Sequence, residues 1–148
     1  MGDYKIVKSV VGALPKQIRD NKIQNYYDFY PSWVFRDSDK EYWTYSNNDF
    51  WNDILPKLKD FEGRSWNEIL QMSKKNNHRI SNTGSFNKVA IKRLNELRIE
   101  ADSIISLRLS GNHRLYGYVI DTAFHILWYD VDHGDNSTCV CRSRLKNT

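Results

Sequence analysis

The hydrophobic period of this chain changes near residue 103, and no other feature constrains the fold as strongly. Before that point apolar residues recur at helical spacing, and after it apolar and polar residues alternate with a period of two. The alternation covers three consecutive runs, separated by the turn-forming pairs Gly111-Asn112 and Asp121-Thr122. The pattern predicts an antiparallel β-meander over residues 103–133.

The preceding part, residues 48–98, is predicted to be helical. Three helices are expected there, and their N-terminal caps are predicted at Asn48 or Asp49, at Ser65 and at Ser85. Ser65 and Glu68 have the spacing of a capping box, which opens the second helix. Pro56 falls inside the first helix, so we expect that helix to kink or restart.

Residues 1–45 are predicted to form a β and irregular segment, with short strands at 4–11 and 33–35, and residues 134–148 a C-terminal tail. A further short strand is expected at 78–80. The length of 148 residues suits one domain. The chain is therefore predicted to be a single α+β domain, with its helices packed on one face of the meander.

The register of the meander follows from its pattern if the turns comprise residues 111–113 and 121–122. The expected pairs are Arg108 with Tyr116 across the first turn, and Tyr118 with His125 and Leu115 with Trp128 across the second. One face would then pack on the helices through Ile105, Leu107, Leu109, Leu115, Val119, Phe124, Ile126 and Trp128. The other would carry Ser106, Arg108, Arg114, Tyr116, Tyr118, His125, Leu127 and Tyr129. A one-residue slip would bury polar groups, so this sorting favours the chosen register.

The second face is unusual because it carries two arginines, three tyrosines and a histidine, and no acid. Arginine matches the geometry of a phosphate, tyrosine offers a ring on which a base can stack, and histidine exchanges a proton near neutral pH. This combination predicts a face that binds RNA through Arg108, Tyr116 and Tyr118. Two alternatives stay open: the tyrosines are cross-strand pairs covered by the N-terminal segment, or the face binds a protein.

Positive charge is concentrated in residues 64–98, which carry eight basic residues against two acidic ones. That stretch has a net charge of +6, whereas the whole chain has +4. The expected third helix contributes Lys88, Lys92 and Arg93, which we predict to contact a phosphate backbone. An ordinary solvated helix face would explain the same residues.

The end of the third strand, Asp130-Val131-Asp132-His133, carries oxygen and imidazole groups that can bind a divalent metal. Turn-forming residues explain the segment without a metal, and we expect neither a metal nor another cofactor. His133 is instead a candidate for proton transfer or phosphate contact. A metal hydrolase on this cluster is a third alternative.

Cys139 and Cys141 are the only cysteines, and we expect side chains so close in the chain to diverge, which would strain a disulfide. Free thiols favour a cytoplasmic location. No apolar run approaches the length that spans a bilayer, and the N-terminus lacks the pattern of a secretory signal, so no membrane association is expected.

The C-terminal block, from Leu107-Arg108-Leu109-Ser110-Gly111 to Phe124-His125-Ile126-Leu127-Trp128-Tyr129-Asp130 and His133, resembles two groups of proteins. One is a set of small uncharacterised bacterial and phage-borne proteins. The other, more loosely, is the C-terminal sheet of RelE-like ribonuclease toxins, over about 30 of the 148 residues. The chain departs from those toxins by a longer N-terminal part, by 15 residues after His133 and by the lack of an identifiable acidic base.

The toxin resemblance implies a RelE-like arrangement of helices and sheet, cleavage of messenger RNA in the ribosome, and an antitoxin partner. It implies that Arg114 stabilises the transition state and that His133 is the terminal acid or phosphate contact, with Tyr129 near it. The hypothesis is thus an RNA-binding protein or metal-independent endoribonuclease, with catalytic candidates Arg114, His125, Tyr129 and His133. The alternative is a non-enzymatic phage or mobile-element protein that binds and inhibits a host protein.

Overall fold

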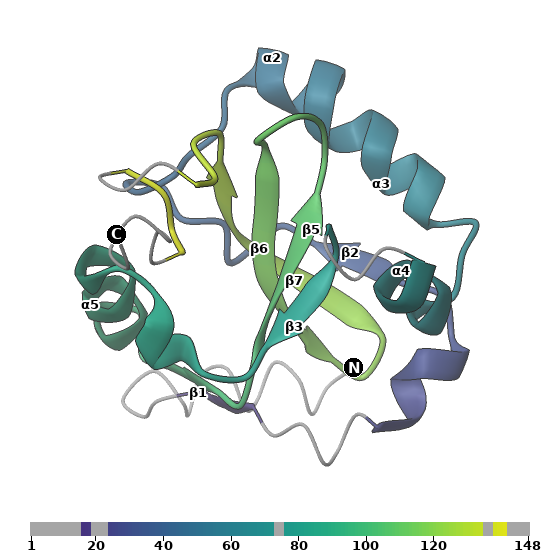
Figure 1. The fold of residues 1–148 in the computed structure, drawn as a ribbon, viewed down its shortest axis with the longest axis horizontal. Helices are drawn as coiled ribbons and strands as arrows, with labels where there is room; N and C mark the ends of the chain where they lie inside the picture. The colour runs from purple at the N-terminus through teal and green to yellow at the C-terminus, as the bar shows by residue number, and fades with distance from the viewer. Residues whose placement is uncertain (1–15, 19–23, 73–75, 135–137, 142–148) are drawn as a thin grey trace.

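A five-stranded mixed sheet forms the centre of the computed structural model, which describes residues 16–18, 24–72, 76–134 and 138–141 (Figure 1). Its strands, in spatial order, are β2 (Ser32–Val34), β7 (Ala123–Asp130), β6 (Arg114–Ile120), β5 (Ile104–Arg108) and β3 (His78–Ile80). All neighbours are antiparallel except β2, which lies parallel to β7. A separate pair joins β1 (Lys16–Ile18) to β4 (Ile99–Ala101) in parallel. The strand expected at 4–11 lies outside the described residues.

The helical part confirms the α+β class. A continuous helical run consists of α2 (Asn47–Asp49), the π-helical η3 (Phe50–Ile54) and α3 (Leu55–Phe61), and it is followed by α4 (Trp66–Met72) and α5 (Lys88–Glu96). Two 3₁₀ turns, η2 (Gln24–Asp28) and η4 (Thr83–Ser85), lie among them. The run restarts as an α-helix at Leu55, directly before Pro56, because a proline fits the first turn of a helix.

One expected cap is confirmed and two were wrong. Ser65 and Glu68 form the capping box of α4, with Ser65 N donating to Glu68 Oε1 at 2.8 Å. The first helix instead begins after Ser46, whose side chain accepts a hydrogen bond from Asp49 N. The third begins after Asn87, whose side chain accepts from the α5 backbone, whereas the residue expected there belongs to η4.

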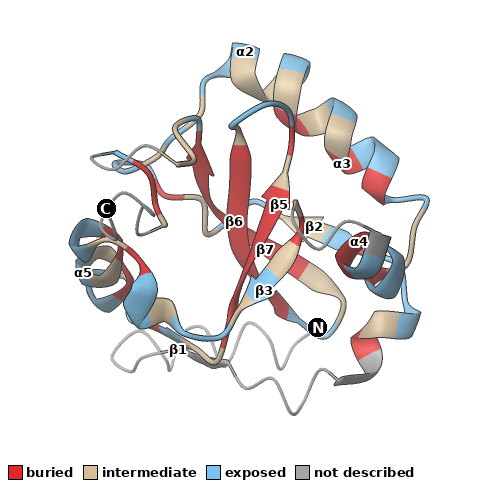
Figure 2. Cartoon of the chain, in the orientation of Figure 1, coloured by how far each residue is buried: buried red, intermediate tan, exposed pale blue. Residues whose placement is uncertain are grey.

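Both faces of the sheet are covered, so the expected packing of all helices on one face was wrong (Figure 2). The first core lies under α3 and α4 and joins Ile54, Leu58, Phe61, Trp66 and Ile69 to Leu107, Leu115, Phe124 and Ile126. The second lies under α5 and joins Phe86, Ala90, Leu94 and Val140 to Ile104, Tyr116, Tyr118, Leu127 and Trp128. The sheet therefore separates two apolar cores.

The β5–β6 register differs from the expected one by two residues. Arg108 lies opposite Arg114, not opposite Tyr116, so the turn comprises residues 109–113. The longer turn is closed by hydrogen bonds from Leu109 N to His113 O and from His113 N to Ser110 O. A shift of two residues leaves every side chain on its own face, because the strand period is two. The face assignment on these strands therefore held although the pairing did not.

A bulge in β7 changes the second hairpin. Tyr118 pairs with His125 as expected, but Tyr116 pairs with Trp128, so Leu127 is the extra residue. The bulge turns Trp128 toward the second core and Tyr129 toward the first, which reverses both expected positions.

Candidate functional site

The polar face of the meander is buried, which overturns its expected role as an open surface for bases or for a partner protein. Tyr116 and Tyr118 are 0% exposed and His125 is 5% exposed. The cover consists of residues 37–43, which belong to the N-terminal segment considered from the sequence, together with α5 and residues 139–141. Base stacking on these tyrosines would require that cover to leave.

The segment 37–43 supplies the acids that the face lacks. Tyr118 donates its hydroxyl hydrogen to Asp37 Oδ2 at 2.7 Å, and His125 Nδ1 lies 3.2 Å from the same oxygen. Burial and the Asp37 carboxylate raise the pKa of Tyr118 above its ordinary value. His125 is therefore part of a buried structural network, four ladder positions along β6 from Arg114.

Arg93 links the segment 37–43 to α5 through hydrogen bonds to Asp39. Its Nε and Nη2 atoms donate to the two oxygens of Asp39 at 2.8 and 2.9 Å, and Trp128 Nε1 donates to Asp39 at 3.0 Å. Burial works to raise the pKa of Asp39, but the hydrogen bonds, above all from Arg93, hold it below its ordinary value. The guanidinium expected to contact a phosphate backbone is thus engaged within the fold, whereas Lys88 and Lys92 are exposed on α5.

Two arginines face each other at the end of the sheet where β5 turns into β6. Arg108 and Arg114 are Cα partners, and both donate to the carbonyl of Gly111, at 3.2 and 2.8 Å. Among the described residues neither forms an ion pair with a carboxylate, and the buried Nε of Arg114 has no hydrogen-bond partner. Burial and the Arg108 charge lower the pKa of Arg114. The carboxylate that faces Arg114 across the β6–β7 ladder, Asp130, acts on it electrostatically but accepts its hydrogen bonds from backbone N–H groups, so both guanidinium groups keep donors that suit an anion.

Histidines and hydroxyls surround this pair. His78 lies beside Ser106 in the β3–β5 ladder, and Ser106 lies beside Tyr116 in the next. The Tyr116 hydroxyl is 3.4 Å from His133 Nδ1. Burial and the Arg114 charge lower the pKa of His78, whose Nδ1 has no partner in the described part of the chain.

We call this group the arginine cluster, and its members are Arg108, Arg114, His78, Ser106, Tyr116 and His133. Its floor is buried, with Arg114 7% exposed, whereas Arg108 at its rim is partly exposed. The cluster therefore combines a largely desolvated guanidinium with a second one that is partly exposed to solvent.

Asp130, considered above as a metal ligand, has a structural role. Its carboxylate is fully buried and accepts hydrogen bonds from Asp132 N at 2.9 Å and Val140 N at 2.7 Å. Burial raises its pKa. The described residues contain no group of three histidine, cysteine or acidic side chains placed to hold a metal ion.

Tyr129 belongs to a second polar network on the opposite face. Asp53, in the π-helical η3, accepts hydrogen bonds from the Tyr129 hydroxyl at 2.6 Å and the Ser110 hydroxyl at 2.8 Å, and its Oδ2 lies 2.6 Å from His113 Nδ1. Burial works against ionisation of Asp53, but these contacts hold its pKa below the ordinary value. The network ties the β5–β6 turn to η3.

The two thiols lie together, which overturns the expectation that they diverge. Cys139 and Cys141 are two residues apart, so on extended backbone their side chains share a side, and the Sγ atoms are 3.4 Å apart. Both are free cysteines. Cys141 Sγ also lies 3.5 Å from His133 Nδ1, which places the pair at the edge of the arginine cluster.

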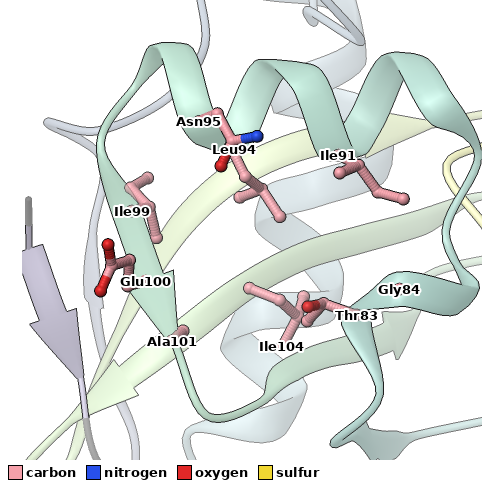
Figure 3. Close-up of a pocket in the computed structure, with 9 residues that line it drawn as sticks. All are labelled: Thr83, Gly84, Ile91, Leu94, Asn95, Ile99, Glu100, Ala101 and Ile104. Carbon is pink, nitrogen blue, oxygen red and sulfur yellow. The ribbon is translucent and has the colours of Figure 1, made fainter.

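A cavity of about 280 Å³ lies between α5, β4 and η4, away from these groups (Figure 3). Its lining is mainly aliphatic and includes Ile91, Leu94, Ile99 and Ile104, with Glu100 at one side. It brings together no set of polar groups that could act on a substrate.

Among the described residues no helix has both the length and the apolar character needed to cross a bilayer.

The structure thus divides the four expected catalytic residues among three places. Arg114 and His133 lie in the arginine cluster, His125 lies with Asp37, and Tyr129 lies with Asp53. The sequence analysis assigned no role to Asp53. The sequence indicates only that Asp53 lies on the helix expected after Asn48. Comparisons with protein-family models, with curated proteins and with solved structures gave no match, so the chemistry of the arginine cluster is the basis for function.

Proposed function

We propose that this protein binds RNA through its phosphate groups at the arginine cluster. The observation that carries the proposal is the pair Arg108 and Arg114, which lie side by side with no carboxylate ion pair among the described residues. Like charges at directly opposed ladder positions destabilise a sheet, so an anionic ligand would relieve a cost that the folded protein bears. A phosphate offers the oxygen acceptors that a guanidinium fork requires.

The same residues suit cleavage of the phosphodiester by attack of the adjacent 2′-hydroxyl. Arg108 and Arg114 would neutralise the charge that develops on the phosphate oxygens. His133 would move a proton at the leaving or attacking oxygen, and the depressed pKa of His78 favours the neutral imidazole that can accept one. This mechanism uses no metal and agrees with the endoribonuclease role implied by the RelE-like resemblance. Cleavage of ribosome-bound messenger RNA and an antitoxin partner belong to the same proposal.

The binding step is tested with a fluorescent single-stranded RNA and a series of salt concentrations. The wild-type affinity should fall steeply with salt, and Arg108→Gln should reduce the slope of log K against log salt by about 0.7, the value for one lost phosphate contact on a single strand. Arg64→Gln is the matched control. It removes the same charge from a partly exposed site between α3 and α4, where Arg64 lies 3.7 Å from Asp60.

A wild-type slope in Arg108→Gln would contradict the proposal, because Arg108 would then contact no phosphate, and an equal fall in Arg108→Gln and Arg64→Gln would contradict it too, because general positive charge would then explain the binding. The cleavage step is tested separately with a single 2′-deoxy substitution in the RNA. That substrate should bind as tightly as RNA and stay intact.

A non-enzymatic protein that binds a host protein is the alternative. The sheet face first considered for it is buried at Tyr116 and Tyr118. Such a protein would show little affinity for RNA at any salt concentration, so the same titration separates the two functions.

A further inference from the structure

The thiols of Cys139 and Cys141 meet at the edge of the arginine cluster, where no function considered so far uses them. Their Sγ atoms are 3.4 Å apart, and Cys139 Sγ donates to the carbonyl of Cys141 at 2.8 Å. An antiparallel bridge between Cys141 and Phe86 anchors this segment beside the start of α5. The fold therefore holds the two sulfur atoms in contact.

The two thiols have different surroundings. Cys139 is fully buried, and its burial together with the neighbouring thiol raises its pKa to about 12. Cys141 is partly exposed, its Sγ lies 3.5 Å from His133 Nδ1, and it interacts electrostatically with the Arg114 guanidinium. The His133 ring and the Arg114 guanidinium thus lie near the Sγ atom of Cys141, whereas the Cys139 thiol is shielded from solvent. Cys141 is thus the thiol that an oxidant reaches first, and Cys139 is the thiol placed to attack it next.

We propose that Cys141 and Cys139 form a peroxide-reactive pair that closes into a disulfide beside the arginine cluster. In the first step the Cys141 sulfur attacks hydrogen peroxide, the O–O bond breaks, and Cys141 sulfenic acid and water form. In the second step Cys139 attacks the sulfenic sulfur, an S–S bond forms, and the hydroxyl leaves as a second water with the Cys139 proton. Each cysteine loses one hydrogen, and one peroxide is reduced to two waters.

Closure of the disulfide changes the cluster. The sulfur atoms must approach from 3.4 Å to about 2.05 Å, so Cys141 moves relative to His133 and Arg114. The thiol that now contacts the His133 ring becomes part of a neutral disulfide. The effect of this change on RNA rests on the proposed function, whereas the oxidation itself does not.

The test uses the full chain, reduced and then treated with hydrogen peroxide, with intact-mass and peptide-mass measurement after acid quenching. The wild type should lose two hydrogens and yield one peptide that contains an internal Cys139–Cys141 disulfide. Cys139→Ser should stop at a sulfenic acid that dimedone traps on Cys141. Cys141→Ser should react with hydrogen peroxide at least about tenfold more slowly than the wild type, because its remaining thiol, Cys139, is buried and protonated.

Two results would overturn the inference: a wild-type chain that keeps both thiols while Cys139→Ser forms no sulfenic acid, or disulfides that join two chains in place of one. A second readout is the His133 ring signal in proton NMR, which should shift on oxidation of the wild type and stay unchanged in Cys141→Ser over the same reaction time, because the oxidised sulfur of Cys141 is the one beside that ring. RNA titration of the reduced protein is independent of these readouts. An internal disulfide without RNA binding would leave the thiol pair established and reject the proposed function.

Discussion

Asp53 offers a direct test of how the candidate site is held in place. Its carboxylate receives the Tyr129 and Ser110 hydroxyls and contacts His113, at 2.6, 2.8 and 2.6 Å. Asp53→Asn keeps the shape and removes the charge, so each contact changes from a charge-assisted hydrogen bond to a neutral one. At about 1 kcal/mol each, the three contacts give a loss of about 3 kcal/mol in the free energy of unfolding. For a chain of this size, that loss corresponds to a fall in Tm of roughly 6 to 12 °C.

The loss should depend on pH. These contacts hold the pKa of Asp53 below its ordinary value in the folded protein, so the native state binds fewer protons there than the unfolded chain does. The stabilisation is therefore complete above the unfolded value of about 4 and is lost as the pH falls through the folded value. The difference in the free energy of unfolding between wild type and Asp53→Asn should keep its full size at about pH 6 to 7 and shrink toward about pH 3.

Urea unfolding of both proteins across this pH range, followed by tryptophan fluorescence, measures the difference. Asp60→Asn is the matched control, because Asp60 is half-exposed and its charged neighbours Lys57 and Arg64 lie at 3.9 and 3.7 Å. A surface pair of this kind contributes about 0 to 1 kcal/mol. An Asp53→Asn effect no larger than that of Asp60→Asn, or one that persists unchanged at low pH, would refute the reasoning.

Three further predictions concern the β6–β7 ladder, the ion pair between Arg93 and Asp39, and the arginine cluster. Gly117→Ala places a Cβ in steric overlap with the His125 carbonyl oxygen, so the β6–β7 ladder must separate, and urea unfolding should show a loss of about 3 kcal/mol or more in the free energy of unfolding. Arg93→Gln leaves the buried Asp39 without its ion-pair partner, and the same measurement should show a loss of about 3 to 5 kcal/mol. Arg114→Ala should abolish growth arrest on overexpression while circular dichroism shows a folded protein, and retained toxicity would reject the assigned role.

The sequence alone determined the fold class and much of the local structure. The change of period near residue 103 correctly predicted the helices, the three-strand meander and the side-chain faces of β5 and β6. The capping box at Ser65 was readable because it depends on residues three apart in the chain. The restart of the first helix at Pro56 was also readable, since a proline acts on its own turn.

Tertiary structure decided the pairing and the cover of the sheet. Alternation cannot distinguish registers that differ by two residues, so the opposition of Arg108 and Arg114 depended on the closure of the turn. The bulge at Leu127, which reversed the next two side chains, breaks the period at one residue and leaves no local pattern.

Whether a polar face is open or buried depends on partners far away in the chain. Asp37 lies 81 residues before Tyr118 and Asp39 lies 89 residues before Trp128, so no local pattern in the sequence indicates either pairing. Burial of a hydroxyl or an indole N–H is tolerated only when an acceptor arrives with the covering segment. A strand pattern therefore determines which residues share a face, and only the folded chain determines which segment covers that face.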